Sequence, residues 1–136
     1  MVSVIMGLKG SGKTKHLIEL VNIAVDKDPG QVVLIEKGQK LTYDIKHGAR
    51  LVDSSACGLH GNDMLRGFVA GLHAGNYDIS HIFIDSLFKV SGSDSIPEAE
   101  ALLTWFDEFG RLNNVNFTVT ISADAADATE KIRKHF

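Results

Sequence analysis

Apolar residues along the chain alternate between short β-branched runs and longer segments with helical spacing. The short runs predict five strands, of which the run at residues 50–53 gives the weakest signal. The predicted strands cover residues 2–6, 32–36, 50–53, 82–85 and 117–122. Between them, apolar residues recur every three or four positions, as they do on the buried face of a helix. This alternation predicts a three-layer α/β fold, in which helices cover both faces of a mainly parallel sheet of about five strands.

Small and polar residues indicate how two of the predicted helices begin and pack. Asn62 or Asp63 is expected to cap the helix that follows the third strand. Gly67 and Gly71 lie one turn apart in that helix, and we expect them to let it press closely on the sheet. After the last strand, residues 125–135 are predicted to form a charged helix.

The segment from Gly7 to Thr14 reads G-L-K-G-S-G-K-T, a complete G-x-x-x-x-G-K-[ST] phosphate-loop (Walker A) pattern. It lies between the first predicted strand and the first predicted helix, which is the context that the pattern requires. Glycines let backbone N–H groups approach phosphate oxygens, and the helix N-terminus adds partial positive charge. Lys13 is expected at the β- and γ-phosphates, and Thr14 is expected to bind Mg²⁺. The expected nucleotide-binding residues are Gly7, Lys9, Gly10, Ser11, Gly12, Lys13, Thr14 and Lys15.

Asp85 ends the fourth apolar run and is the candidate for the acidic residue that accompanies a phosphate loop. In such sites a carboxylate at the end of a buried strand reaches the Mg²⁺ shell. An aspartate at a strand end also serves as an ordinary turn or helix-cap residue. Taken together with Thr14, Asp85 predicts a Mg²⁺ site beside the phosphate loop.

With these motifs the chain resembles the P-loop NTPase superfamily over nearly its whole length, and most closely the RecA-like (ASCE) branch. The resemblance implies a P-loop fold, binding of ATP with Mg²⁺, and a polar γ-phosphate sensor, here Thr120 or Ser122. The Ile-Glu pair ending at Glu36 is similar to a strand end in twitching-motility and type II secretion ATPases, where the glutamate polarises the attacking water. By that resemblance Glu36 is a candidate catalytic base, with Lys13 and Asp85 as the other catalytic residues. Those ATPases also have an N-terminal domain and His-containing motifs that 136 residues cannot accommodate.

The chain also resembles bacterial-type thymidine kinases, which open with the same strand, loop and a helix carrying a Leu-Ile pair, here Leu17-Ile18. Ser86 stands where that family has a glutamate, and the family's four zinc-binding cysteines are missing. The four arginines form no cluster of the kind that neutralises a transferring phosphate in small-molecule kinases. The Asn-Lys-x-Asp guanine reader of GTPases is absent too, so ATP is the nucleotide expected by elimination.

Composition narrows the class of protein further. A chain of 136 residues with 44% hydrophobic residues is expected to form one domain, spanning residues 1–136. The net charge of −3 and the lack of a Lys/Arg-rich run argue against a dedicated nucleic-acid or anionic-membrane surface. No segment reads as a membrane span or a signal peptide, so a cytoplasmic protein is expected. Cys57 is the single cysteine and is interpreted as inert, and the histidines lack metal-ligand spacing.

Three functional hypotheses remain open from the sequence. The first is a slow or partner-activated Mg²⁺-dependent ATPase, whose site a protein partner or a second copy of the chain completes. The second is a non-catalytic, nucleotide-dependent binding or switch module, and the third is a small nucleoside or metabolite kinase. Residues 36–49 follow a strand end, and they either contact a second substrate or the γ-phosphate, or form a solvated connecting loop.

Overall fold

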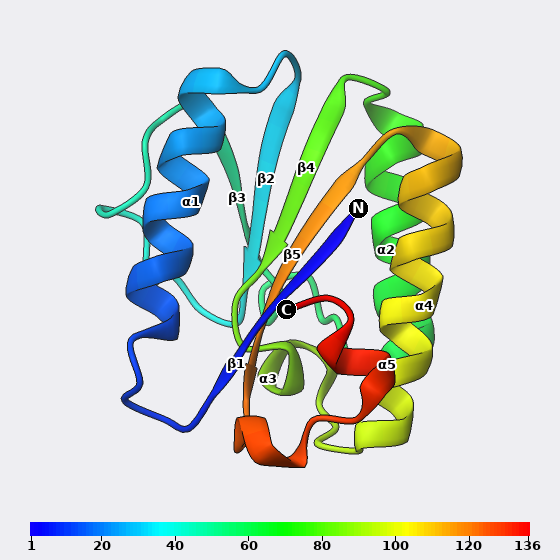
Figure 1. Cartoon of the computed structure of the whole chain (residues 1–136). Helices are drawn as coiled ribbons and strands as arrows, with labels where there is room; N and C mark the ends of the chain where they lie inside the picture. Colours follow the sequence, from blue (N-terminus) through cyan, green and yellow to red (C-terminus); the bar gives the residue numbers. More distant parts are fainter.

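Five strands form one sheet in the order β1-β5-β4-β2-β3 in the computed structural model, which describes residues 1–136 (Figure 1). The strands are β1 (Val2–Gly7), β2 (Gln31–Glu36), β3 (Ala49–Asp53), β4 (Ile79–Ile84) and β5 (Asn116–Ser122). Every pairing between neighbours is parallel. The five predicted strands are therefore confirmed, including the one with the weakest signal, which is an edge strand.

Helices cover both faces of the sheet, as the alternating pattern predicts. Helix α1 (Lys13–Lys27) lies on one face, and α2 (Asn62–Gly75) and α4 (Ile96–Asn113) lie on the other (Figure 1). A cluster of eight buried apolar residues packs α1 against the sheet, and a cluster of 23 packs α2 and α4 against the opposite face. The protein therefore has the predicted three-layer α/β fold. None of its helices combines the length and apolarity needed to cross a bilayer.

Strand β2 shows why the central strands read as continuous apolar runs. Val32 and Leu34 belong to the core on the α1 side, whereas Val33 and Ile35 belong to the core on the other side. Side chains alternate between the two faces of a strand, so a strand covered on both faces is apolar at most positions. Glu36 is buried at the end of β2 and is the first polar exception to this rule.

Several helix boundaries differ from the prediction. Gly61, with φ of +87°, precedes the first turn of α2, so neither Asn62 nor Asp63 is the cap. The predicted charged helix at 125–135 is instead a 3₁₀ turn, η1 (Ala125–Asp127), and a short helix, α5 (Glu130–Arg133). Ala128 is extended between these two elements, which breaks the helix. An additional short helix, α3 (Leu87–Ser91), follows β4 and was not predicted.

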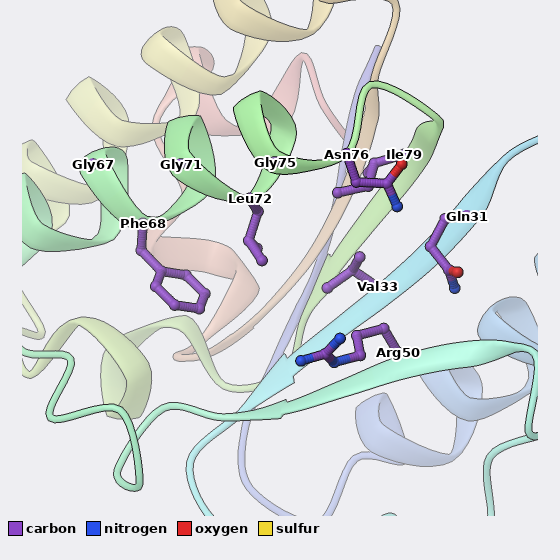
Figure 2. A pocket seen from close by; sticks show the side chains of 10 residues that line it. All are labelled: Gln31, Val33, Arg50, Gly67, Phe68, Gly71, Leu72, Gly75, Asn76 and Ile79. Carbon is purple, nitrogen blue, oxygen red and sulfur yellow. The ribbon is translucent and has the colours of Figure 1, made fainter.

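The expectation that Gly67 and Gly71 bring α2 close to the sheet is wrong. A Cβ atom built on either glycine would meet no heavy atom within 4 Å, so neither glycine marks a close approach. The two glycines instead line a groove of about 570 Å³ between α2 and the β2–β3 edge, into which Val33 and Arg50 also project (Figure 2). The groove exists because α2 contacts the core through larger side chains, such as Val69, on a neighbouring face.

Candidate functional site

The phosphate loop, residues 7–14, joins β1 to α1 at the carboxyl end of the sheet (Figure 1). Gly10 and Gly12 have φ of +84° and +88°, a left-handed conformation that costs glycine little. Within the loop, the Ser11 N–H donates to the Leu8 carbonyl at 3.1 Å. A Cβ atom on Gly7 would lie 2.6 Å from the Ser11 hydroxyl oxygen, so a larger residue here would force the Ser11 side chain to move.

Backbone N–H groups at the start of α1 are left without protein acceptors. The N–H groups of Gly12, Lys13, Thr14 and Lys15 donate to no other backbone or side-chain group. No side chain caps this helix, and its first turn contains no acidic residue. The first N–H groups of a helix need external acceptors and favour an anion through the helix dipole. The amino end of α1 therefore presents several N–H donors that no protein group satisfies.

The Lys13 ammonium lies across the phosphate loop. Its Nζ atom donates to the Leu8 carbonyl at 2.9 Å and lies 3.5 Å from the Ser11 hydroxyl, and the residue is 9% exposed. The side chain makes no ion pair with a carboxylate. A nearly buried cation that is held only by neutral oxygens has a strong tendency to bind an anion.

A cavity of about 460 Å³ lies in front of the phosphate loop, and its volume is in the range of small-molecule sites. It contains no hydrophobic and no acidic lining residue, but it contains four lysines. The lining residues are Lys9, Gly10, Gly12, Lys13, Thr14, Lys15, Ser86, Lys89 and Ser122. The cavity is therefore polar and positively charged in a protein whose net charge is −3.

Asp85 lies at the end of β4, where it meets the phosphate loop. Its two carboxylate oxygens are each 3.3 Å from the Thr14 hydroxyl, and one of them accepts a hydrogen bond from the buried Thr120 hydroxyl at 2.9 Å. Strand β5 lies between β1 and β4, and this strand order places Thr120 beside both elements. The structure thus brings together the two residues expected to bind Mg²⁺. Mg²⁺ prefers oxygen ligands and keeps several waters, so a hydroxyl and one carboxylate beside a phosphate cavity fit this ion.

Ser86 adopts an unusual backbone conformation next to Asp85. Its φ is +59°, which is uncommon for a residue with a side chain, and its N–H donates to the Thr120 hydroxyl at 2.7 Å. Backbone strain of this kind is found preferentially at functional sites. Here it directs the chain from β4 into α3 beside the cavity.

Glu36 lies at the end of β2 beside a second, smaller cavity of about 120 Å³, which Thr14 and Asp85 also line. Its Oε2 atom accepts a hydrogen bond from the Leu41 N–H at 3.1 Å, and the residue is only 8% exposed. Burial raises the pKa of the Glu36 carboxyl, and the negative charge of Asp85 raises it further. The three candidate catalytic residues therefore lie around adjoining cavities: Lys13 lines the larger, and Glu36 and Asp85 the smaller.

The two candidate γ-phosphate sensors occupy different environments. Thr120 is fully buried, and its hydroxyl already donates to Asp85 and accepts from Ser86. Ser122 is exposed and lines the larger cavity. Ser122 therefore borders the larger cavity, whereas Thr120 holds the Asp85 carboxylate.

Lys89 is a cavity residue that the sequence did not indicate. It belongs to α3, a five-residue helix that is too short to show apolar periodicity. The available signal was its spacing, four residues after Asp85, which places it one helical turn beyond the strand end.

Residues 37–48 form a loop that is anchored to α1 rather than freely solvated. Leu41 and Ile45 are buried in the core on the α1 side. The Asn22 side chain donates to the Asp44 carbonyl at 3.0 Å and accepts from the Lys46 N–H at 2.9 Å. The loop therefore holds Lys37 and Lys40 beside Glu36 at the smaller cavity.

Comparisons with known proteins give structural similarity at low sequence identity. No protein-family model matches the chain, and no curated protein matches it either. Among solved structures, the chain is similar to the pCW3 conjugation coupling protein TcpA, in its monomer form with ATPγS. The identity is 14% and the TM-score is 0.49, over 98% of this chain and 46% of that one. The chain thus spans less than half the length of that structure.

Proposed function

We propose that this protein binds a nucleoside triphosphate, with ATP as the expected nucleotide, together with Mg²⁺. The observation that carries the proposal is the set of free N–H groups and lysines that converge on one polar cavity at the phosphate loop. This cavity lies at the carboxyl end of a parallel sheet, where ligands of open α/β folds bind. A lining of lysines without hydrophobic or acidic residues does not suit an apolar ligand, and it suits a cation only in the company of an anion.

The residues of the phosphate loop would divide the work of binding phosphate. The N–H groups of Gly12, Lys13, Thr14 and Lys15 would donate to phosphate oxygens, and the Lys13 ammonium would exchange the Leu8 carbonyl for a charged acceptor. The Thr14 hydroxyl and the Asp85 carboxylate would hold Mg²⁺. When bound, Mg²⁺ neutralises the charge of the phosphate groups.

We further propose slow or partner-activated hydrolysis, with Glu36 accepting a proton from the attacking water. The cavity of about 120 Å³ beside Glu36 is large enough to hold water. A carboxylate whose pKa is raised by burial is a better general base near neutral pH than an exposed one. No arginine lines either cavity, so a partner or a second copy would supply any further positive charge.

A nucleotide-dependent switch module is the second candidate function. The loop at residues 37–48 joins the small cavity to α1, because Glu36 holds the Leu41 N–H and Asn22 holds Asp44 and Lys46. A phosphate that displaces the Glu36–Leu41 hydrogen bond would therefore change the contacts of this loop. Loops that respond to a terminal phosphate in this way transmit the nucleotide state to partners.

The first experiment is an equilibrium titration of MgATP, MgADP, MgGTP and MgGDP against the wild type and Lys13→Ala. Loss of a charge-assisted contact of about 1.5–3 kcal/mol predicts affinity for MgATP lower by about 10- to 150-fold. Lys27→Ala is the matched control, because Lys27 ends the same helix and lies about 20 Å away at 1.5 Å per residue. Equal affinities of the wild type and Lys13→Ala would refute the site.

A further inference from the structure

Three adjoining cavities at the carboxyl end of the sheet have one side chain in common, that of Lys89. The first is the phosphate-loop cavity of about 460 Å³, and the second is the cavity of about 120 Å³ beside Glu36. The third is an open cavity of about 530 Å³, which Lys37, Phe88 and Asp94 also line. Lys89 therefore stands where the phosphate-loop cavity meets the cavity beside Glu36.

The backbone that carries Lys89 is firmly placed, although its ammonium is free. Leu87 and Val90 of α3 are each 1% exposed, and the N–H of Ser86 at the start of α3 is bound to Thr120. The Lys89 N–H donates to the Ser86 carbonyl at 3.0 Å, but its side chain is exposed, and its ammonium makes no hydrogen bond or ion pair with a protein group. The fold therefore sets the position of the Lys89 backbone, while the ammonium at the end of the side chain is unpaired.

Lysines are concentrated around these three cavities. Six of the ten lysines of the chain line one or more of the three cavities. They are Lys9, Lys13, Lys15, Lys37, Lys40 and Lys89. Lys37 lines the small cavity and the open one, so it and Lys89 border the same space.

We infer that Lys89, assisted by Lys37, binds the terminal phosphate and makes the site selective for a nucleoside triphosphate over the diphosphate. The inference rests on the proposed nucleotide-binding function. If Glu36 acts on a water that attacks the terminal phosphate, that phosphate must lie between the phosphate loop and the Glu36 cavity, and Lys89 lines both. The inner phosphates are satisfied by the loop N–H groups and Lys13, so a diphosphate has no need of Lys89. An ammonium acts on phosphate as a point charge, which suits a group that carries extra negative charge.

The test compares the affinities of Lys89→Gln and the wild type for MgATPγS and MgADP. We expect affinity for MgATPγS to fall by about tenfold and affinity for MgADP to change by less than about twofold, as for loss of one charged contact. Lys37→Gln should shift the same ratio in the same direction by a smaller factor. Lys27→Gln, which removes a lysine from the far end of α1, should leave both affinities unchanged.

Inorganic triphosphate and diphosphate provide an independent arm of the test, because they lack the base and the sugar. In Lys89→Gln, inorganic triphosphate should compete less well with MgATPγS for the site than it does in the wild type. Competition by inorganic diphosphate should be unchanged. An equal loss for both nucleotides, or no loss for either, would overturn the inference even if Lys13→Ala abolishes binding as proposed. Wild-type behaviour of Lys13→Ala would instead refute the binding site itself, so the two failures are distinguishable.

Discussion

Strand β5 has a buried threonine toward each end, and each threonine pairs with a polar residue in or directly after β4. Toward the carboxyl ends, the Thr120 hydroxyl donates to Asp85 at 2.9 Å. Toward the amino ends, the Thr118 hydroxyl is 2.8 Å from His81 Nε2. Thr118 and Thr120 are both almost completely buried, so the two pairs place the same hydroxyl group at a similar depth.

The surroundings of the two pairs differ. His81 is held by protein groups, although its side chain remains 18% exposed: its ring stacks on Phe83 with the ring centroids 4.0 Å apart, and its Nδ1 atom lies 3.6 Å from Asp28. Asp85 faces outward to Thr14 and to the cavity beside Glu36. A polar group whose partners are all protein atoms serves stability, whereas one that keeps part of its bonding capacity toward a cavity is available to a ligand.

Among tests of the contrast between the two ends of the sheet, the largest effect is expected for Glu36→Gln at the carboxyl end. Glutamine keeps an oxygen acceptor for the Leu41 N–H but cannot take up a proton from water. We expect ATP turnover to fall by at least about 100-fold, as for loss of a general base, with MgATP affinity changed by less than about twofold. Steady-state turnover and equilibrium titration on the same preparations measure the two quantities.

Asp53→Asn is the matched control for that substitution. Asp53 is the register partner of Glu36 on the neighbouring strand, but it lines neither cavity at the phosphate loop. It holds the Gly38 and Ser55 N–H groups, for which asparagine retains an acceptor. Turnover should therefore survive in Asp53→Asn. Parallel losses of turnover and affinity in Glu36→Gln would contradict its role as a base.

The next effect is the difference between Thr120→Val and Thr118→Val, which remove the same hydroxyl at the two ends. Thr120 bonds to a carboxylate and to the Ser86 N–H, so its loss should cost about 2–3 kcal/mol of unfolding free energy. Thr118 bonds to a histidine, so its loss should cost about 1 kcal/mol. Urea denaturation of both variants measures the difference. A greater cost for Thr118→Val would mean that the two pairs do not differ as described.

Much of this architecture could be predicted from the sequence, because buried parallel strands are apolar at most positions. The strands, the two helical layers and the setting of the phosphate loop follow from that rule and from glycine spacing. Asp85 could be predicted as well, since a carboxylate at the end of an apolar strand is conspicuous.

Other features depend on distances that a sequence does not contain. Thr120 and Ser122 are two positions apart and equivalent by pattern, yet only Ser122 passes beyond the core to reach the cavity. Lys89 lies on a helix too short to have a periodicity. Gly67 and Gly71 were expected at a close contact between α2 and the sheet, but no atom lies near either glycine. Glycine spacing alone does not reveal whether the facing surface is occupied.

The smallest effect concerns pH and the His81–Thr118 pair at the amino end. Burial lowers the pKa of His81 to about 4 from 6.5, and Asp28 offsets only part of that shift. In the unfolded chain His81 takes up a proton near pH 6.5, whereas in the folded protein it is protonated only near pH 4. The free energy of unfolding therefore falls as the pH drops through this interval. This group should remove about 1 kcal/mol of unfolding free energy between pH 6.5 and 5.5.

Comparison of wild type with His81→Gln isolates this contribution, because the slope from His81 should vanish in the variant. Burial also lowers the pKa of His135, which contributes in the same direction and remains in both proteins.

Glu36 at the carboxyl end has the opposite effect. Because its pKa is raised in the folded protein, the free energy of unfolding falls as the pH rises above 4.5, and acid favours the folded state. Denaturation at several pH values should therefore show that the free energy of unfolding falls more steeply with acid in Glu36→Gln than in the wild type. In His81→Gln it should fall less steeply. Identical slopes in all three proteins would show that the two ends of the sheet do not differ in how they hold their ionisable groups.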